Sequence, residues 1–326
     1  MIVQGLESAS AGDSQAVFDI LQRAKEGRRA LGFVDGEAFR LVDGAADGLP
    51  GVVVEEYAGR WLVQSADPLT ESVRAALVLT GHACWWKHLD AHEKTSPIWI
   101  PGTGGLSEES AETAAQTPFL VREGGLNLEI CFSSGYSQGL FLDQRDNRAR
   151  VRSQVSTHMP VLNLFAYTCA FSVAAAAGGA VASSVDLSGA SLEWGRRNFA
   201  HNGMAPKDHY FTKGDALEWL RVFAKKGRLF GGIILDPPTF SRAKGRKVWR
   251  VEEDFHALVA AAVPVLAPGG WMLCSTNCRR LAEWQFDEQI HVGFADNGRS
   301  CQVEWGTMPC DFTGPSYLLN GWCRDV

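Results

Sequence analysis

Residues 160–190 read PVLNLFAYTCAFSVAAAAGGAVASSVDLSGA, and this stretch decides the fold class. Two apolar segments at 161–165 and 181–185 flank an alanine-rich segment at 170–177, which ends at a pair of glycines. Glycine just past a helix readily takes the left-handed conformation that ends many helices. The pattern therefore predicts a strand, a helix and a second strand, which is the repeating unit of a parallel sheet.

The same alternation continues to the end of the chain. Strands are predicted at 161–165, 181–185, 209–212, 231–235, 271–275, 300–305 and 316–323. Helices are predicted at 170–177, 188–201, 215–225, 252–266 and roughly 280–294. We therefore expect a doubly wound α/β sheet of seven strands, Rossmann-like in topology, within residues 121–326.

The residues before about 120 follow a weaker and different pattern. Apolar residues at helical spacing predict a helix over 15–31, and short apolar runs predict strands at Phe39–Val42 and Val52–Val54. The loop between these strands, residues 43–51, is rich in glycine and aspartate and suits an antiparallel connection. Residues 1–120 are accordingly expected to form a smaller α+β domain.

The composition is that of a folded protein. Hydrophobic residues make up 46% and charged residues 21% of the chain, and no apolar run approaches the roughly 20 residues that cross a bilayer. No secretory signal pattern is found at the N-terminus, so a cytoplasmic location is expected and a membrane partner is not. The eight cysteines lack C-x-x-C pairs and zinc-type spacing, so no metal is expected.

The formal net charge of −6 argues against nucleic-acid binding by bulk electrostatics, so any such contact must be local. Basic residues gather in two runs, which are Arg145, Arg148, Arg150 and Arg152, and then Arg242, Lys244, Arg246, Lys247 and Arg250. A solvated helix face and an anion-binding patch are both open for the first run.

Doubly wound sheets bind ligands beyond the carboxyl ends of their strands. Asp186 ends the second predicted strand, where a carboxylate could accept two hydrogen bonds from a ribose diol. A helix cap is the alternative for Asp186, although Ser188 could itself be that cap. Asp215 follows the third strand, where it could accept the amine of an adenine or cap its own helix.

The Asp236-Pro237-Pro238 turn after the fourth strand is the most specific element. Proline has no N–H and a fixed φ, so the carbonyl groups and the Asp236 carboxylate are left as acceptors for a planar amine or a base edge. Phe240 could stack on such a base. A plain strand-ending turn is the alternative.

The loop after the first strand bears on the cofactor. A nicotinamide enzyme would carry G-x-G-x-x-G there, but residues 163–171 contain no glycine, so a pyrophosphate could not approach the backbone. A sulfonium ligand has no phosphates and needs no such loop. The absence favours S-adenosylmethionine over NAD.

Several stretches together carry a resemblance to a known family. They are Arg40–Gly44, Asp47–Gly51, Phe141–Arg148, Leu162–Thr168, Val185–Ser188 and Asp236–Ser241. The chain resembles the bacterial large-subunit rRNA methyltransferases that modify cytosine C5 or guanine N7 in 23S RNA. The resemblance implies a class I methyltransferase fold, S-adenosylmethionine as methyl donor and RNA as partner, with the N-terminal domain as a candidate RNA contact. The family usually has glycine where this chain has Cys169.

We therefore expect a cofactor site and a target site. The cofactor is expected at Asn163, Phe165, Ala166, Tyr167, Thr168, Asp186, Ser188 and Asp215, with Gln144 and Arg145 closing the pocket. The target base is expected at Asp236, Pro237, Pro238 and Phe240. Tyr167 would face the sulfonium, and Arg145 could meet a phosphate.

The segment after the fifth strand indicates the target atom. Methylation at cytosine C5 requires a thiolate that adds to C6, and in the family's cytosine-modifying members this thiol lies in a Ser-Cys-Ser stretch. The matching position here is Thr276, between Cys274 and Cys278, and the segment is closer to the Ser-Asn-Asn-Lys-Arg pattern of the guanine-N7 members. We predict direct SN2 transfer to a guanine nitrogen by a monomer or homodimer. A C5 enzyme that uses Cys278, a small-molecule methyltransferase and a non-catalytic S-adenosylmethionine-binding protein are the alternatives.

Overall fold

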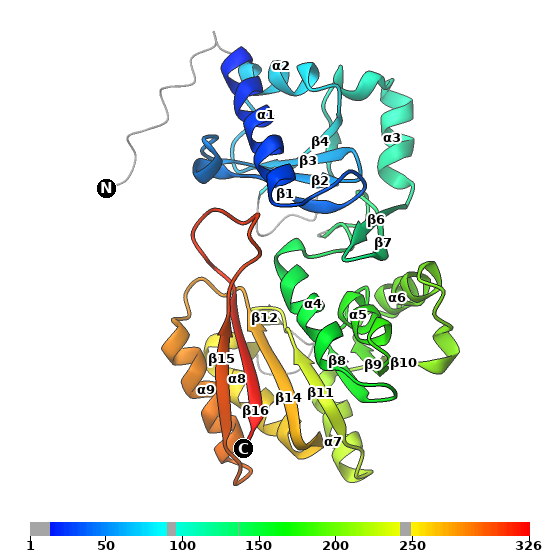
Figure 1. Ribbon diagram of the computed structural model, residues 1–326, viewed down its shortest axis with the longest axis vertical. Coiled ribbons are helices and arrows are strands. Elements are labelled where there is room, and N and C mark those ends of the chain that lie inside the picture. Colours follow the sequence, from blue (N-terminus) through cyan, green and yellow to red (C-terminus); the bar gives the residue numbers. More distant parts are fainter. Residues whose placement is uncertain (1–13, 90–95, 136, 242–248) are drawn as a thin grey trace. The chain divides into compact units, whose positions relative to one another are not determined.

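The computed structural model describes residues 14–89, 96–135, 137–241 and 249–326 (Figure 1). The chain divides into two compact units. Unit 1 comprises Met1–Leu142 and Pro309–Pro315, and unit 2 comprises Asp143–Met308 and Ser316–Val326.

The division between the units falls after Leu142, whereas the sequence pattern placed it near residue 120. The difference lies in a hairpin of β6 (Phe119–Glu123) and β7 (Leu126–Ile130), which groups with unit 1. The amide of Arg122 donates to the carbonyl of Gly36 over 2.8 Å and fastens the hairpin to the segment before the first strand.

Unit 2 is built on a seven-stranded sheet in the order β10-β9-β8-β11-β14-β16-β15 (Figure 1). The strands are β8 (Pro160–Leu164), β9 (Val181–Asp186), β10 (Tyr210–Lys213), β11 (Phe230–Leu235), β14 (Leu266–Thr276), β15 (Cys301–Gly306) and β16 (Leu319–Asp325). Neighbouring strands are parallel except at β16, which is antiparallel to both β14 and β15. The predicted doubly wound fold is confirmed.

Helices cover both faces of this sheet because its strands bury side chains on both sides. The helices are α4 (Arg145–Gln154), α5 (Ala170–Ala177), α6 (Gly189–His201), α7 (Ala216–Lys225), α8 (Val251–Ala262) and α9 (Glu283–Ala295). Along β11, Ile233 and Leu235 belong to the core cluster that includes Phe255 of α8. The intervening Ile234 belongs to the opposite cluster, which includes Phe171 of α5.

The strand order reverses at β8, which has β9 on one side and β11 on the other. Leu164 of β8 and Leu235 of β11 are paired at the carboxyl ends of these strands. The loops that begin with Phe165 and Asp236 therefore leave the sheet side by side at the reversal point, which is where doubly wound sheets bind ligands.

The predicted helix over 252–266 is shorter in the structure. Helix α8 ends at Ala262, a 3₁₀ turn follows over Val263–Val265, and β14 begins at Leu266. Pro264 in this turn has no N–H to donate, so it cannot continue the α-helical ladder. The strand thus starts earlier than the predicted 271.

Unit 1 contains a five-stranded sheet in the order β1-β2-β3-β4-β5. Its strands are β1 (Ala38–Asp43), β2 (Val52–Tyr57), β3 (Arg60–Ser65), β4 (Ala83–His88) and β5 (Ile98–Trp99), and its helices are α1 (Ser14–Ala30), α2 (Glu71–Leu79) and α3 (Glu108–Gln116). Strands β1 and β2 are antiparallel, as predicted for the loop over 43–51. The core includes Leu21 of α1 and Leu77 of α2.

The Arg40–Gly44 and Asp47–Gly51 stretches build a buried ionic network in unit 1. The Arg40 guanidinium binds Asp43 over 2.8 Å and Glu55 over 2.9 Å. Arg28 of α1 pairs with Asp47 over 2.6 Å. Burial alone would raise the pKa of Asp47, but the hydrogen bonds and charge of its partners lower it below the usual value. These residues therefore stabilise unit 1.

The same network holds the segment Pro309–Pro315. Asp311 is fully buried, and its Oδ2 accepts from the Arg40 amide over 2.7 Å. Its carbonyl accepts from Arg28 over 3.0 Å. The Gly314 amide donates to Asp43 over 2.7 Å. The connection between β15 and β16 is thus part of unit 1.

Within the described part of the chain, no helix is long and apolar enough to span a membrane. The same residues include no group of three or more His, Cys, Asp or Glu side chains arranged to hold a metal ion.

Candidate active site

The loop after β8 has a strained backbone. Phe165, Tyr167 and Cys169 have φ angles of +58°, +46° and +62°, in the left-handed region that side chains disfavour. Such conformations persist where the surrounding structure fixes them, and they cluster at ligand sites. Here the Tyr167 amide donates to Oδ2 of Asp186 over 2.8 Å, and the Cys169 amide donates to the Ala166 carbonyl over 2.7 Å. The loop is therefore held to the end of β9.

Asp186 is the residue that holds this loop. Its Oδ2 accepts from Tyr167, and its Oδ1 accepts from the Ser188 amide over 2.7 Å. A carboxylate has about four lone-pair sites, so it has the capacity for further bonds to a ribose diol. Ser188 itself caps α6, because its hydroxyl accepts from the Ser191 amide over 3.1 Å. The cap of α6 is therefore Ser188 and not Asp186.

Asn163 and Thr168 lie inside the fold. They are 2% and 1% exposed. The side-chain amide of Asn163 donates to the Ser172 hydroxyl over 2.9 Å. The backbone carbonyl of Thr168 accepts from the side-chain amide of Asn198 over 2.9 Å. These contacts tie β8 and its loop to α5 and α6. The structure gives both residues a supporting role for the loop.

Phe165 and Tyr167 are the more accessible side chains of the loop. Both are partly exposed, whereas Ala166 between them is 6% exposed. Phe165 packs against the main core cluster, and the Tyr167 ring lies 6.3 Å from that of Trp194 in α6. A ligand could reach these two aromatic rings.

Cys169 occupies the position where the resemblance noted in the sequence analysis leads us to expect glycine. It is fully buried, and burial raises the pKa of its thiol to about 12. A Cβ at Gly195 of α6 would lie 2.3 Å from the Cys169 sulfur. Glycine at 195 thus makes room for the thiol, which stays protonated and packs like a small apolar group.

Asp215 caps α7. Its Oδ1 accepts from the Glu218 amide over 3.0 Å. The capping alternative is therefore realised, and the recognition of an adenine amine by Asp215 stays a prediction.

Asp236 lies at the end of β11 in a network of polar side chains. The Gln144 amide donates to Oδ2 of Asp236 over 3.2 Å and to the Ser275 hydroxyl over 2.8 Å. Its carbonyl accepts from Asn147 over 2.6 Å. The Ser275 hydroxyl donates to Asn320 over 2.8 Å. Gln144 therefore contacts Asp236, the first residue of the predicted target site, and its expected role at the cofactor stays a prediction.

This environment changes the acidity of Asp236. Burial, with the charge of Asp143, raises the pKa of the carboxyl to about 7, although the charge of Arg148 and the bond from Gln144 oppose the shift. At neutral pH the carboxyl can therefore be protonated or ionised. Perturbed carboxyls at the mouth of a sheet are candidates for catalysis.

The rest of the Asp236 turn is partly open. Pro237 is buried, Pro238 is exposed and the Phe240 side chain is 43% exposed. The Arg250 guanidinium lies 5.4 Å from the centre of the Phe240 ring. An aromatic face beside a cation suits a stacked base.

The first basic run is largely engaged within the fold. Arg148 is 3% exposed, and Arg150 forms a bidentate pair with Glu304 over 2.6 and 2.8 Å. Arg145 begins α4 and is partly exposed. Of the second run, Arg250 is described, whereas Arg242, Lys244, Arg246 and Lys247 lie outside the described residues.

The cysteines near the fifth strand lie in the interior. Cys274 is fully buried and Cys278 is 5% exposed, and both belong to the main core cluster. Thr276 is fully buried, and its hydroxyl accepts from the Cys278 amide over 3.2 Å. The thiols of Cys274 and Cys278 are therefore both enclosed in the core.

Sequence reasoning missed the residues that hold Gln144 beside Asp236. Asn147 and Ser275 bond Gln144, and Asn320 bonds Ser275, from three separate segments of the chain. Asn147 lies within the Phe141–Arg148 stretch, and Ser275 follows Cys274 in the segment searched for a nucleophile.

Comparison with known proteins decides the class. The family model described as S-adenosylmethionine-dependent methyltransferase matches residues 101–289, which is more than half of the chain. The chain belongs to this methyltransferase family. S-adenosylmethionine is accordingly its cofactor, and methyl transfer is its reaction class.

The relatives of this methyltransferase include rRNA enzymes. Ribosomal RNA large subunit methyltransferase I of Aeromonas salmonicida is 32% identical over 291 residues, or 87% of this chain and 72% of the relative. Ribosomal RNA large subunit methyltransferase K/L of Methylococcus capsulatus is 38% identical over 195 residues, or 59% of this chain and 25% of the relative. The resemblance to large-subunit rRNA methyltransferases is confirmed.

Solved structures agree with the fold of the methyltransferase. A protein assigned as a methyltransferase and crystallised with SAH matches with a TM-score of 0.80 and 25% identity, over 95% of this chain and 81% of that chain. A second structure, from Streptococcus mutans, matches with a TM-score of 0.79 and 24% identity over the same shares, 95% and 81%. At 24% identity, the match to the Streptococcus mutans structure is evidence for a shared fold only.

Proposed function

We propose that this methyltransferase transfers a methyl group to a guanine nitrogen of large-subunit rRNA by direct displacement. The observation that carries the proposal is the Asp236 carboxyl, held by Gln144 four positions before the exposed side chain of Phe240, with a pKa near neutrality. The names of the relatives in Aeromonas and Methylococcus support an rRNA substrate.

The residues of the β8 loop fit the cofactor. The loop lacks the glycines that a pyrophosphate needs, and its strained backbone is fixed by Asp186, which can accept further hydrogen bonds from ribose hydroxyls. Phe165 and Tyr167 offer aromatic rings to a cation. When bound, S-adenosylmethionine supplies an electrophilic methyl group on a sulfonium. Asp215 would accept the adenine amine.

Asp236 would hold the target base. Its ionised carboxylate would accept hydrogen bonds from the N–H groups of guanine and stabilise the positive charge that the ring gains when a ring nitrogen takes the methyl group. Both interactions favour the ionised form, so binding of the base lowers the pKa of Asp236. If an amino nitrogen is the acceptor, the same carboxylate can take its proton.

Direct transfer is supported by the cysteine positions. A C5 mechanism requires a thiolate that reaches the base, whereas Cys274 and Cys278 pack in the core and Thr276 stands at the matching position. A nitrogen with a lone pair needs no covalent help, only positioning. Phe240 and Arg250 would provide the positioning by stacking and by contact with a phosphate.

Catalysis and RNA contact would be divided between the C-terminal and N-terminal regions that the sequence predicts. The catalytic residues named above lie in unit 2. The N-terminal α+β region would contact the RNA. Action on rRNA also fits the cytoplasmic location expected from the sequence, with the protein acting as a monomer or homodimer.

Transfer of labelled methyl groups tests this function. The purified protein would be incubated with tritiated S-adenosylmethionine and either deproteinised large-subunit rRNA or a small-molecule extract. We expect label in ribonuclease-sensitive material, and none with the Asp236→Ala variant. Label confined to small molecules, or none with a protein that binds S-adenosylhomocysteine, would contradict the proposal.

A further inference from the structure

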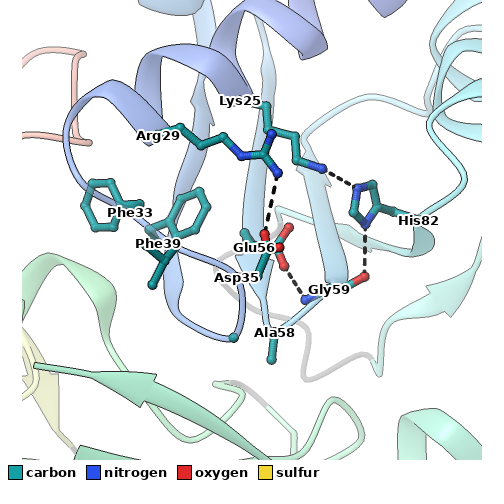
Figure 2. A pocket seen from close by; sticks show the side chains of 11 residues that line it. Lys25, Arg29, Phe33, Asp35, Phe39, Glu56, Ala58, Gly59 and His82 are labelled. Carbon is teal, nitrogen blue, oxygen red and sulfur yellow. Dashed lines mark hydrogen bonds and ion pairs between the residues drawn. The ribbon is translucent and has the colours of Figure 1, made fainter. Parts of the chain in front are cut away.

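Unit 1 contains a cavity of about 330 Å³ that the proposed reaction does not use. Figure 2 shows Lys25 and Arg29 reaching over it from α1, with Phe33 and Phe39 on one side and His82 on the other. Cavities of this size can enclose a small organic ligand. The side chains that line the cavity indicate what kind of ligand it could bind.

The ammonium group of Lys25 lines the cavity and is held in place by a neighbouring side chain. Its Nζ lies 2.8 Å from Nε2 of His82, whose Nδ1 lies 3.2 Å from the carbonyl of Gly59. Because a carbonyl only accepts, Nδ1 carries the proton and Nε2 accepts from the ammonium. Burial, and then the charge of Lys25, lower the pKa of His82 and keep it neutral. The His82 ring is fixed by stacking on Trp61, with centroids 4.5 Å apart.

Arg29 adds a second positive charge. Its Nη2 lies 3.7 Å from Oδ1 of Asp35, and both side chains are exposed, at 58% and 93%. An exposed ion pair at this distance contributes little free energy. The Arg29 guanidinium can therefore exchange Asp35 for another anion. A phosphate would be the better partner, because it accepts two parallel hydrogen bonds.

Glu56 is the buried acid of the wall. It is 7% exposed, and it accepts hydrogen bonds from the Gly59 amide and the Trp61 indole. Burial raises the pKa of its carboxyl. Both Glu56 oxygens are thus engaged by Gly59 and Trp61, and the cations of the wall are Lys25 and Arg29, with the exposed carboxylate of Asp35 beside Arg29.

An aromatic pair completes the wall. The Phe33 and Phe39 rings are stacked, with centroids 4.8 Å apart and an interplanar angle of 29°. Phe39 is 7% exposed and belongs to the core, whereas Phe33 is partly exposed. Phe33 therefore offers an accessible aromatic surface that Phe39 supports. Nucleobases stack on such surfaces with little sequence preference.

We propose that this cavity holds one unpaired nucleotide of an RNA strand, with its base against Phe33 and a phosphate at Lys25 and Arg29. The inference rests on the proposed RNA substrate and adds a second RNA-binding site, in unit 1. Stacking and phosphate contacts carry little sequence information, so this site anchors the strand and does not select the methylated base.

Binding of a short RNA to the full chain tests the site. Fluorescence anisotropy would follow a labelled single-stranded RNA of about nine nucleotides, a length that spans a typical single-strand site. Saturating S-adenosylhomocysteine would keep the RNA out of the cofactor site. The variants are Lys25→Ala, Arg29→Ala and Phe33→Ala, with Arg23→Ala as a matched control, because Arg23 lies exposed on α1 outside the cavity wall.

The variants should separate the two contacts. Phe33→Ala should weaken binding about tenfold at an unchanged salt dependence, since stacking involves no counterion. Lys25→Ala and Arg29→Ala should each lower the slope of log K against log salt by about 0.7, the value for one phosphate on a single strand. Arg23→Ala should match the wild type. A circular dichroism spectrum and a melting temperature equal to those of the wild type would show that each variant, unit 1 included, is folded, and Arg29 is exposed enough to be removed without loss of packing.

Two results would overturn the inference in distinguishable ways. If the wild type methylates rRNA while the three variants bind the short RNA with wild-type affinity and slope, the cavity is not an RNA site and the proposed function stands. If the wild type binds S-adenosylhomocysteine but neither binds nor methylates RNA, the proposed function fails and the cavity inference fails with it.

Discussion

The side-chain amide of Gln144 donates to the carboxylate of Asp236 over 3.2 Å and to the hydroxyl of Ser275 over 2.8 Å. Its carbonyl is fixed by Asn147, so the amide group faces the carboxylate in one orientation. A donor in this position favours the ionised form of Asp236, against the burial that raises its pKa. Gln144 therefore contributes to the acidity of the residue that we propose to hold the target base, which burial chiefly determines.

Removal of this donor should shift the pH dependence of methyl transfer. If ionised Asp236 is required, kcat/KM should rise with pH through about 7, the pKa of the free enzyme. Gln144→Ala removes a bond that lowers this pKa, so its midpoint should lie above that of the wild type. Gln154→Ala, a matched change at the other end of α4, should keep the wild-type profile. Equal midpoints for all three proteins would show that Gln144 does not act through Asp236.

Loss of the Asp186 carboxylate should abolish most cofactor affinity. Asp186→Ala removes the acceptor for ribose hydroxyls and also the bond that holds Tyr167 in its strained conformation. Calorimetry with S-adenosylhomocysteine would measure the loss. As a control, Ser107→Ala removes the cap of α3 and should cost about 1 kcal/mol of stability with binding intact. Wild-type affinity in Asp186→Ala would exclude the ribose role.

A side chain at position 195 should conflict with Cys169. In Gly195→Ala the new Cβ would lie 2.3 Å from the thiol sulfur, so the free energy of unfolding should fall by about 1–3 kcal/mol, as in other overpacked cores. Cys169→Gly in the same chain should restore much of this loss, because it removes the clash and suits the positive φ at 169. Chemical denaturation would measure the free energy of unfolding of the two single variants and of the double variant. Additive losses would mean that the two positions do not interact.

The buried cysteines should be dispensable for catalysis. Cys274→Ala and Cys278→Ala should each lose some stability, since both positions lie in the core, but should retain methyl transfer. RNA that contains 5-fluorocytosine should form no covalent adduct with the wild type. An adduct that disappears in Cys278→Ala would reassign the target atom to cytosine C5.

The sheet of unit 2 was predictable because several of its strands are short apolar runs between clear helix ends. The predicted strand at 181–185 is observed as Val181–Asp186, for example, and the one at 231–235 as Phe230–Leu235. Unit 1 was less predictable. Strand β4 pairs in parallel with β3, and the segment before it carries no strong periodicity that would have indicated this pairing.

Partners that lie far apart in the sequence explain what was missed. Gln144 was expected beside the cofactor, and the structure bonds its amide to Ser275, 131 positions away, and to Asp236, a link that the sequence pattern could not indicate. The backbone amide of Arg40, in a recognised motif, donates to the carboxylate of Asp311, 271 positions away, so this link to the segment Pro309–Pro315 could not be inferred. Local pattern indicates which residues lie at a loop, whereas the long-range contacts decide what each side chain touches.

Mass spectrometry of nucleosides from 23S rRNA, taken from cells with and without the gene, tests direct transfer to guanine most directly. We predict that one methylated guanosine is lost without the gene, that it returns with the wild-type protein, and that it does not return with Asp236→Ala. Loss of 5-methylcytidine instead, or an unchanged nucleoside profile, would contradict the proposed reaction.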